Sequence, residues 1–304
     1  MAIVAVGSLA FDSINTVKGK RERMLGGSLT HFANAAYFLS KPHLIGIVGG
    51  DFSSENWDFI RSKAGSIEGI DILKEEKSFF WEGVYSEDFE KRETITTELN
   101  AFAKFDPVVP FSYRKRPFIL FLANIDPEIQ KKVVLQSPES TLKILDTMNY
   151  WISSSYEKLS AVLNVVDGII VNEEEAFLLT GEKNIVMAAE KIFRPHFKMV
   201  ILKKGANGVM VFGKDFIVSL PSFPLRDITD PTGAGDSFAG AFISYLDRLG
   251  TLNYSQAVVK NAAAYATVVA SFAVEGYGVD GLKGISKKDI NKRLDEFRKI
   301  TACK

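Results

Sequence analysis

Short apolar runs alternate with longer stretches of helical periodicity, and this alternation constrains the fold more than any other feature. Each run is nearly continuous in aliphatic and aromatic residues, which suits a parallel strand buried on both faces. The alternation predicts an α/β fold with a central, mostly parallel sheet. The predicted strands are residues 3–8, 43–49, 118–125, 142–147, 167–172 and 199–205, and the predicted helices are 30–39, 53–64, 173–180, 186–193 and 287–300.

Two segments break this alternation. Residues 14–25 and 79–102 are rich in β-branched and aromatic residues around polar turns, which is typical of β-ribbons. They fit poorly into a parallel sheet. We expect one domain over residues 1–304, with these two segments forming a small β-lid inserted in it.

Composition and charge exclude several classes of protein. Lys plus Arg and Asp plus Glu are both 37, so no basic surface for nucleic acid is expected. The N-terminus reads as a buried strand rather than a leader, and residues 261–274 are too short and too polar for a membrane span. The only cysteine is Cys303, which excludes an intrachain disulfide. We expect a soluble cytoplasmic protein without nucleic-acid or membrane partners.

Common nucleotide and metal motifs are missing from the sequence. The Gly-Lys pairs at residues 19–20 and 213–214 lack the Ser or Thr that a P-loop needs, and the first strand is not followed by a dinucleotide fingerprint. His31, His43 and His196 are scattered, and we interpret each as structural. With one cysteine there is no zinc cluster.

One stretch carries chemistry of its own: DPTGAGDSFAGAF, residues 230–242. Gly233, Ala234 and Gly235 can bring backbone N–H groups close to a ligand, and a helix predicted to start near Asp236 adds its positive dipole end. Together these predict a phosphate pocket. The Asp236 carboxylate is then explained if it accepts the proton of a hydroxyl that attacks the phosphate. The alternative is an Asp that caps the helix.

This stretch resembles the signature of the ribokinase-like (PfkB) carbohydrate kinases. GGSLTHFANAA, residues 26–36, resembles the N-terminal Gly-Gly signature of the same family, and the resemblance extends along nearly the whole chain. It implies a ribokinase-like three-layer fold and ATP-dependent phosphorylation of a hydroxyl. Asp236 would be the base, and Gly233, Ala234 and Gly235 would form the anion hole.

The resemblance also implies a nucleotide and metal site. VNEEEAFLLTG resembles the NxxE element, so Asn172 would lie beside ATP and Glu175 would order Mg²⁺ through water; the alternative is a capped acidic helix start. Lys203 would contact ATP phosphate, whereas Gly205 and Gly208 would either line the nucleotide or only shape a hairpin. The remaining implied positions are Asn261, as a nucleotide contact, and Asp230, the nearest match to the potassium site of the family.

On the acceptor side the resemblance assigns Asp12 to substrate hydroxyls, and Gly26 and Gly27 to a hinge of the lid. Each also has a structural alternative, as a turn cap or a bend. We add three asparagines as candidate substrate contacts: Asn34, Asn100 and Asn124. Residues 146–151, DTMNYW, lack the arginine of the corresponding family element, which weakens a sugar-acid substrate, and ribose is not the default.

The leading hypothesis is an ATP-dependent sugar or polyol kinase. A nucleoside kinase is the alternative, because aromatic residues of the lid can stack a base or can instead form the core of the lid or a homodimer contact. These residues are Phe79, Phe80, Trp81 and Tyr85. A non-catalytic sensor on the same fold is disfavoured, because a sensor needs no base at Asp236.

Overall fold

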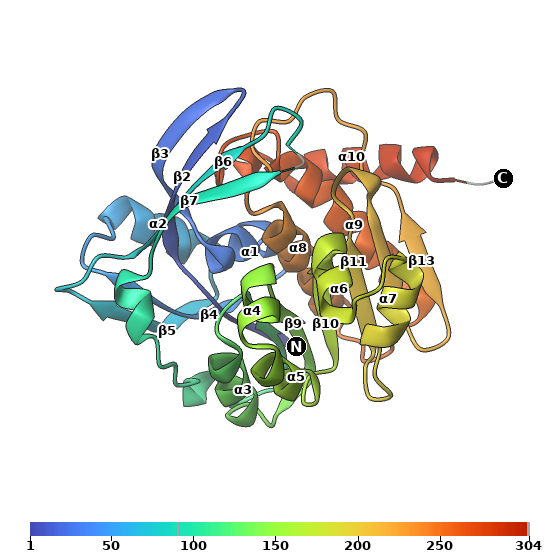
Figure 1. The fold of residues 1–304 in the computed structure, drawn as a ribbon, viewed down its shortest axis with the longest axis horizontal. Coiled ribbons are helices and arrows are strands. Elements are labelled where there is room, and N and C mark those ends of the chain that lie inside the picture. The colour runs from blue at the N-terminus through green and yellow to red at the C-terminus, as the bar shows by residue number, and fades with distance from the viewer. Residues whose placement is uncertain (90, 303–304) are drawn as a thin grey trace.

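A nine-stranded sheet organises the structure, a computed structural model that describes residues 1–89 and 91–302 (Figure 1). Its order is β13-β12-β11-β10-β9-β8-β1-β4-β5, and every neighbouring pair is parallel except the antiparallel β11–β12 and β12–β13. The strands are β1 Ala2–Val6, β4 His43–Gly49, β5 Ser66–Leu73, β8 Phe118–Leu122, β9 Ser140–Asp146, β10 Gly168–Asn172, β11 Met199–Lys203, β12 Val209–Phe212 and β13 Ile217–Leu220.

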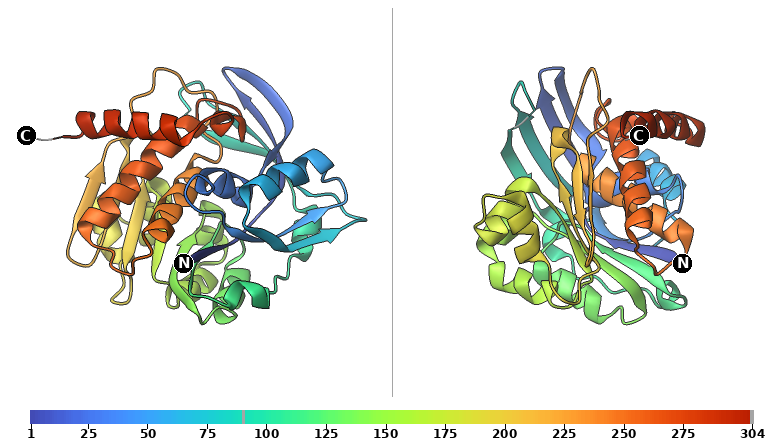
Figure 2. Two further views of the ribbon diagram at one scale, coloured as in Figure 1. Left: turned by 180° about the vertical axis from the view of Figure 1, so that it is seen from behind. Right: turned by 90° about the vertical axis from the view of Figure 1, so that its right-hand side faces the viewer.

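Helices cover both faces of this sheet and make three layers, which the right-hand view of Figure 2 displays edge-on. One hydrophobic core lies between the sheet and α1, α2, α8, α9 and α10, and a second lies between the sheet and α3 to α7. The helices are α1 Ser28–Ala36, α2 Ser54–Lys63, α3 Pro127–Leu135, α4 Asn149–Ser154, α5 Tyr156–Leu163, α6 Glu173–Thr180, α7 Ile185–Ile192, α8 Ala234–Leu249, α9 Gln256–Ala273 and α10 Lys287–Ile300, with 3₁₀ turns η1 Asn100–Lys104, η2 Phe111–Arg114, η3 Gly205–Asn207 and η4 Asp280–Leu282.

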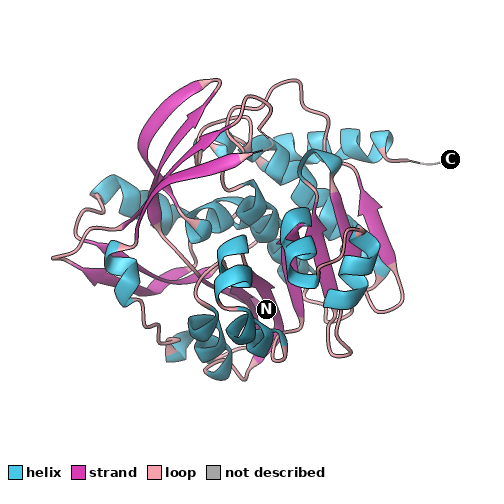
Figure 3. Cartoon of the chain, in the orientation of Figure 1, coloured by secondary structure: helices cyan, strands magenta, loops and turns pink. Residues whose placement is uncertain are grey.

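A second sheet of four strands stands apart from the main one (Figure 3). Its order is β3-β2-β6-β7, with β2 Ala10–Thr16, β3 Gly19–Gly26, β6 Phe79–Tyr85 and β7 Arg92–Glu98. The two segments that break the α/β alternation therefore meet in one sheet. The ribbon is longer at its start than expected, because β2 begins at Ala10, and shorter at its end, where residues 100–102 belong to η1.

The predicted α/β class is confirmed, and most predicted elements differ from the observed ones by one to three residues. The edge strands β5 and β13 were not predicted, because edge positions mix polar with apolar residues and weaken the buried pattern, and β12, next to β13, is only four residues long. Cys303 lies outside the described residues, as does Glu90 within the second ribbon. Within the described part, no helix has the length and apolar character of a membrane span.

The contact of α1 with α8 fixes where the late motif lies. A Cβ placed on Gly240 of α8 would lie 2.2 Å from the carbonyl oxygen of Phe32 on α1, so the two backbones touch at this point. The Phe32 ring stacks on Phe121 of β8 at a centroid separation of 4.4 Å, and both rings are fully buried. This packing ties the start of α8 to the sheet through α1.

We therefore expect Gly240→Ala to lower the thermal stability, because the added methyl group forces α1 and α8 apart and overpacked cores typically lose about 1–3 kcal/mol. The exposed Arg248 on the same helix offers a control, since Arg248→Ala should stay within about 0.5 kcal/mol of the parent. Thermal melting of the two variants measures this, and equal melting temperatures would show that the helices tolerate the methyl group.

Candidate active site

Three polar side chains end neighbouring strands of the main sheet. Asp146 is the last residue of β9, Asn172 the last of β10 and Lys203 the last of β11. Because the carboxyl ends of parallel strands share one edge of the sheet, these side chains converge there. The Lys203 Nζ lies 3.4 Å from Asp146 Oδ2, and the Asp146 carboxylate also accepts a hydrogen bond from the N–H of Thr147 at 2.9 Å.

The start of α8 faces the same edge. Gly233, its N-cap, has φ 71° and ψ 4°, a left-handed conformation that favours glycine. In the described chain the N–H groups of Gly233, Gly235 and Asp236 have no protein acceptor, whereas the N–H of Ala234 donates to the carbonyl of Pro231 at 3.1 Å. The predicted anion hole therefore differs in one member, because Ala234 is engaged in a turn and the Asp236 N–H is free instead.

Lys203 lies beside this turn. A Cβ on Gly235 would be 2.9 Å from the Lys203 Nζ. Burial alone would lower the pKa of Lys203, but the carboxylates of Asp146, Glu175 and Asp236 outweigh it and raise that pKa. The site thus holds a permanently charged ammonium group next to free backbone N–H groups at a helix start, an arrangement that binds a phosphoryl oxygen.

Asp236 is half-buried at the third position of α8. It is not the N-cap, and α8 has no side-chain cap, so the interpretation of Asp236 as a helix cap is wrong. Burial and the nearby Asp146 carboxylate raise the pKa of Asp236 to about 7, although His31 and Lys203 act in the opposite direction. A carboxylate with a pKa near neutrality is a stronger base than an exposed one and is still ionised in part at neutral pH.

Asn172 and Glu175 form a capping box at the start of α6. Asn172 Oδ1 accepts from the N–H of Glu175 at 2.8 Å, and Glu175 Oε2 accepts from the N–H of Asn172 at 2.7 Å. Burial raises the pKa of Glu175 to about 7, against the lowering effect of Lys203. The structural alternative for this pair is therefore realised, and it leaves Glu175 Oε1 free of a hydrogen bond.

These residues fit a magnesium ion held through water. Within the described residues no three His, Cys, Asp or Glu side chains converge as a metal cage. Mg²⁺ commonly keeps several waters and binds one or two carboxylates together with substrate phosphates. Glu175, with its second oxygen free at the edge where Lys203 lies, would hold such an ion, and bound Mg²⁺ would neutralise phosphate charge.

On the other side of α8 lies the predicted acceptor group Asp12. It is buried on β2, and its Oδ2 accepts a long hydrogen bond of 3.4 Å from the N–H of Gly27, the N-cap of α1. A Cβ on Gly26 would overlap Asp12, so the Gly-Gly pair packs against this carboxylate. The structural alternative, in which these glycines form a bend, therefore agrees with the structure. Their role as a hinge of a lid stays a prediction.

Several other predicted residues have structural contacts instead. Asn34 donates to the carbonyl of Val279 at 3.0 Å, Asn100 to that of Ser78 at 3.0 Å, and Asn124 to Met148 Sδ at 3.1 Å. Asn124 Oδ1 is buried without a partner, so this side chain keeps an acceptor for a ligand, whereas Asn100 lies at the far end of the small sheet.

The other residues that the sequence assigned to the nucleotide or to a potassium ion are not part of the cluster of Asp146, Lys203 and Asp236. Gly205 and Gly208 have φ 52° and 90° and flank the η3 turn between β11 and β12, as the hairpin alternative requires. Asn261 is exposed on α9. Asp230 is buried and accepts from the N–H groups of Thr232 at 2.8 Å and Gly278 at 2.9 Å, so both of its oxygens support the loop.

The small sheet touches the loop that begins α8. Tyr85 on β6 shares a hydrogen bond of 3.0 Å with the hydroxyl of Thr232, one residue before Gly233. Arg92 pairs with Tyr85 across β6 and β7, and its guanidinium lies 5.3 Å from the centre of the Trp81 ring. The small sheet therefore contacts the loop before the candidate anion hole, and its role as a lid stays a prediction.

Sequence reasoning missed two residues of the site. His31 was interpreted as structural, but its ring lies against Gly233, with its Nδ1 2.3 Å from where a Cβ of Gly233 would be. Asp146 was noted only for the missing arginine after it, although a polar residue at the end of a buried strand was a usable signal. His43 and His196 do have structural settings, against Tyr113 and the Leu163 carbonyl.

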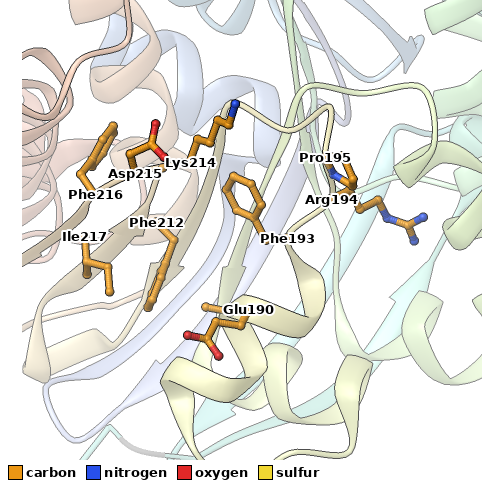
Figure 4. Close-up of a pocket in the computed structure, with 11 residues that line it drawn as sticks. Glu190, Phe193, Arg194, Pro195, Phe212, Lys214, Asp215, Phe216 and Ile217 are labelled. Atoms are coloured by element: carbon orange, nitrogen blue, oxygen red, sulfur yellow. The ribbon is translucent and has the colours of Figure 1, made fainter.

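A pocket of about 740 Å³ lies elsewhere, between α7 and the β12–β13 hairpin (Figure 4). Phe193, Phe212 and Ile217 line it together with the charged Glu190 and Lys214. These residues precede β11, end β12 and begin β13, so the pocket opens at the sheet edge opposite Asp146 and Lys203. It is not part of the candidate active site.

Comparison with known proteins agrees with this geometry. Residues 2–283 match the description of the pfkB family carbohydrate kinases. The cytidine kinase of Thermococcus kodakarensis is 27% identical over 252 residues, which are 81% of this chain and 88% of that kinase. Fructokinase-1 of Oryza sativa is 33% identical over 90 residues, 28% of this chain and 27% of the fructokinase.

A solved structure has the same fold. A protein of E. coli assigned as a ribokinase II, in complex with ATP and Mg²⁺, superposes with a TM-score of 0.77. It is 20% identical and covers 97% of this chain and 99% of its own. The three-layer architecture predicted from the sequence is therefore that of a ribokinase-like protein.

We predict that Asp236→Asn lowers kcat by at least about 10²-fold, because it removes the proton acceptor and keeps the shape. ATP binding should persist, since a negative charge near the phosphates is lost. The folded-state pKa of about 7 exceeds that of an unfolded Asp, so ionised Asp236 destabilises the fold as pH rises toward 7. The variant should therefore melt at a higher temperature than the parent at pH 8, with little difference near pH 4. Turnover within a few-fold of the parent would rule out Asp236 as the base.

We also predict that kcat/KM falls as pH drops through about 7, because protonated Asp236 cannot accept the hydroxyl proton. The pKa of Glu175 is also about 7, so a control is needed. If the protonation of Asp236 causes this fall in kcat/KM, which is the acidic limb of the pH profile, Glu175→Gln lowers the rate but keeps the acidic limb. A pH profile of Glu175→Gln that is flat between pH 6 and 8 would assign the limb to Glu175 instead.

Proposed function

This chain belongs to the pfkB family of carbohydrate kinases and is a phosphotransferase with a hydroxyl acceptor, and we propose that its acceptor is a nucleoside. The similarity to cytidine kinase extends over 81% of this chain, whereas the similarity to fructokinase covers 28%. The longer match includes both the acceptor and the nucleotide halves of the chain. It favours the alternative of the sequence analysis over a free sugar or polyol.

The observation that carries this proposal is the position of Trp81. In the parallel pair β2–β6, Trp81 lies directly beside Asp12, and paired residues point to the same face of a sheet. Tyr85, four residues further along β6, lies on that face too and contacts the anion-hole loop. An indole ring and a carboxylate thus face the site side by side, which suits a flat base joined to a sugar with vicinal hydroxyls.

Other aromatic residues of the small sheet are engaged in packing. Phe79 stacks on Phe102 at 5.5 Å, and Phe80 lies 5.8 Å from the guanidinium of Arg23. Trp81 has partners too, because its indole N–H donates to Thr94 Oγ1 at 3.2 Å and the Arg92 guanidinium lies 5.3 Å from its ring centre. We assign Trp81 to the base because it is the aromatic residue paired with Asp12.

The reaction follows from the arrangement around α8. The acceptor hydroxyl, held by Asp12, attacks the terminal phosphorus of ATP, and the P–O bond to ADP breaks. Asp236 takes the hydroxyl proton as the new bond forms. The N–H groups of Gly233, Gly235 and Asp236, with the Lys203 ammonium, stabilise the charge on the transferred group. The products are ADP and a phosphorylated nucleoside.

A free sugar is the second candidate, because the fructokinase match is the more identical one over its shorter length. A furanose ring alone would use Asp12 in the same way and leave Trp81 without a role in binding. The two acceptors thus differ in how much they depend on the indole ring.

We expect ADP release from ATP and Mg²⁺ to be fastest with a nucleoside in a panel of nucleosides, sugars, phosphosugars and polyols. Trp81→Ala should raise the acceptor KM at least about tenfold, because a base stacked on an aromatic side chain typically contributes about 1–3 kcal/mol. Trp81→Phe keeps a ring and should recover most of the affinity.

The control is Phe80→Leu, which changes the neighbouring aromatic residue, because alternation along β6 places Phe80 on the opposite face of the strand, beside Arg23. Its acceptor KM should stay near that of the parent. A free hexose or polyol as best acceptor, with a KM indifferent to Trp81→Ala, would replace the nucleoside by a sugar.

A further inference from the structure

His31 lies between the two halves of the candidate site. It belongs to the first turn of α1, is 3% exposed, and its ring packs against the left-handed Gly233 at the start of α8. Its Nε2 is 3.9 Å from Asp12 Oδ2, which is an ion-pair distance but too long for a hydrogen bond. Nε2 is buried and has no hydrogen-bond partner in the described chain.

Carboxylates of three elements act on this ring. Asp12 on β2 is the near one, with its Oδ2 3.9 Å from Nε2, and Asp236 on α8 and Asp230 in the loop before α8 add electrostatic effects. Burial works to lower the pKa of His31, but these three carboxylates outweigh it and raise that pKa. The imidazole therefore tends to be protonated where an isolated buried imidazole would be neutral.

The influence is mutual. The groups that act on Asp236 are the carboxylates of Asp146 on β9 and Asp12 on β2, the ammonium of Lys203 on β11, and His31 on α1. Asp146 and Lys203 already form an ion pair with each other at 3.4 Å. His31 is thus the cation on the acceptor side of Asp236 that balances its charge.

We propose that His31 is a positioning residue that carries a proton in the resting enzyme and, through its charge, keeps Asp236 ionised and ready to accept the hydroxyl proton. This proposal rests on the proposed function for the role of Asp236, but the protonation of His31 can be measured without turnover. A merely structural His31 would fill space against Gly233 and would have no electrostatic link to Asp236.

The first test is the titration of His31 by NMR in protein labelled at histidine, without ATP or acceptor. The three histidines are assigned with His31→Asn and His43→Asn, and His43 should titrate low because burial lowers its pKa. We expect His31 to titrate above His43 and above an ordinary exposed imidazole. In Asp236→Asn the midpoint of His31 should fall by about one pH unit, because proton binding at two coupled sites is reciprocal.

The second test is the pH profile of kcat/KM for His31→Asn, with His43→Asn as the control, at a half-buried histidine outside the site. Loss of the His31 charge should move the acidic limb upward by about one pH unit, so that activity at pH 6 falls about tenfold further than activity at pH 9. His43 lies at the start of β4, outside the site, and its variant should keep the limb of the parent.

Three outcomes would overturn the proposal: a His31 that stays neutral from pH 6 to 8, a midpoint unchanged in Asp236→Asn, or a His31→Asn profile lowered equally at every pH. The NMR titration is measured on the parent and on Asp236→Asn. His31→Asn serves in it only to assign the His31 resonance. If the coupling is found but no acceptor is phosphorylated, the proposed function fails and the protonated His31 stands. If phosphorylation is found without the coupling, only the role of His31 fails.

Discussion

The backbone approach at the start of α8 is the constraint on which the rest of the structure depends. Gly233 must adopt a left-handed conformation under the His31 ring, and Gly240 must touch the backbone of α1 about two turns further on. Together these contacts set the height of the helix start above the ends of β9 and β11. Free N–H groups, an ammonium group and a carboxylate can share one small volume because no side chain separates them.

That volume concentrates charge away from water. Asp146 and Glu175 are buried and Asp236 is half-buried, and loss of solvent raises the pKa of each. Such a cluster destabilises a fold unless cations balance it, and here Lys203 does so on the nucleotide side. On the acceptor side the balancing group is the imidazole of His31. Binding of a phosphate donor with its metal would redistribute these charges, which is what a phosphoryl-transfer site requires.

The two sheets supply different residues of the candidate site. The main sheet supplies the charged side chains at the ends of its parallel strands, where backbone geometry is rigid. The small sheet supplies Asp12 and Trp81 and contacts the anion-hole loop through Tyr85 and Thr232. Further hydrogen bonds hold the small sheet in this position, because Thr16 donates to the carbonyl of Thr229 at 3.2 Å and Tyr277 donates to that of Gly19 at 2.8 Å.

The sequence by itself determined the fold class and the late glycine motif, because buried strands and a Gly-Ala-Gly-Asp turn are local patterns that need no knowledge of neighbours. It also supplied Asp12, Asn172, Glu175 and Lys203 as members of the family pattern. Asn34 and Asn100 each donate a hydrogen bond to a backbone carbonyl, and their contact with a substrate stays a prediction, because the sequence pattern of an asparagine is the same in a structural and in a binding position. Only the tertiary structure decided that His31 lies against Gly233, some two hundred residues away in the chain, and that Asp146 pairs with Lys203. The physical reason is that a charge acquires its role from the charges that packing brings beside it, and no local pattern records which those are.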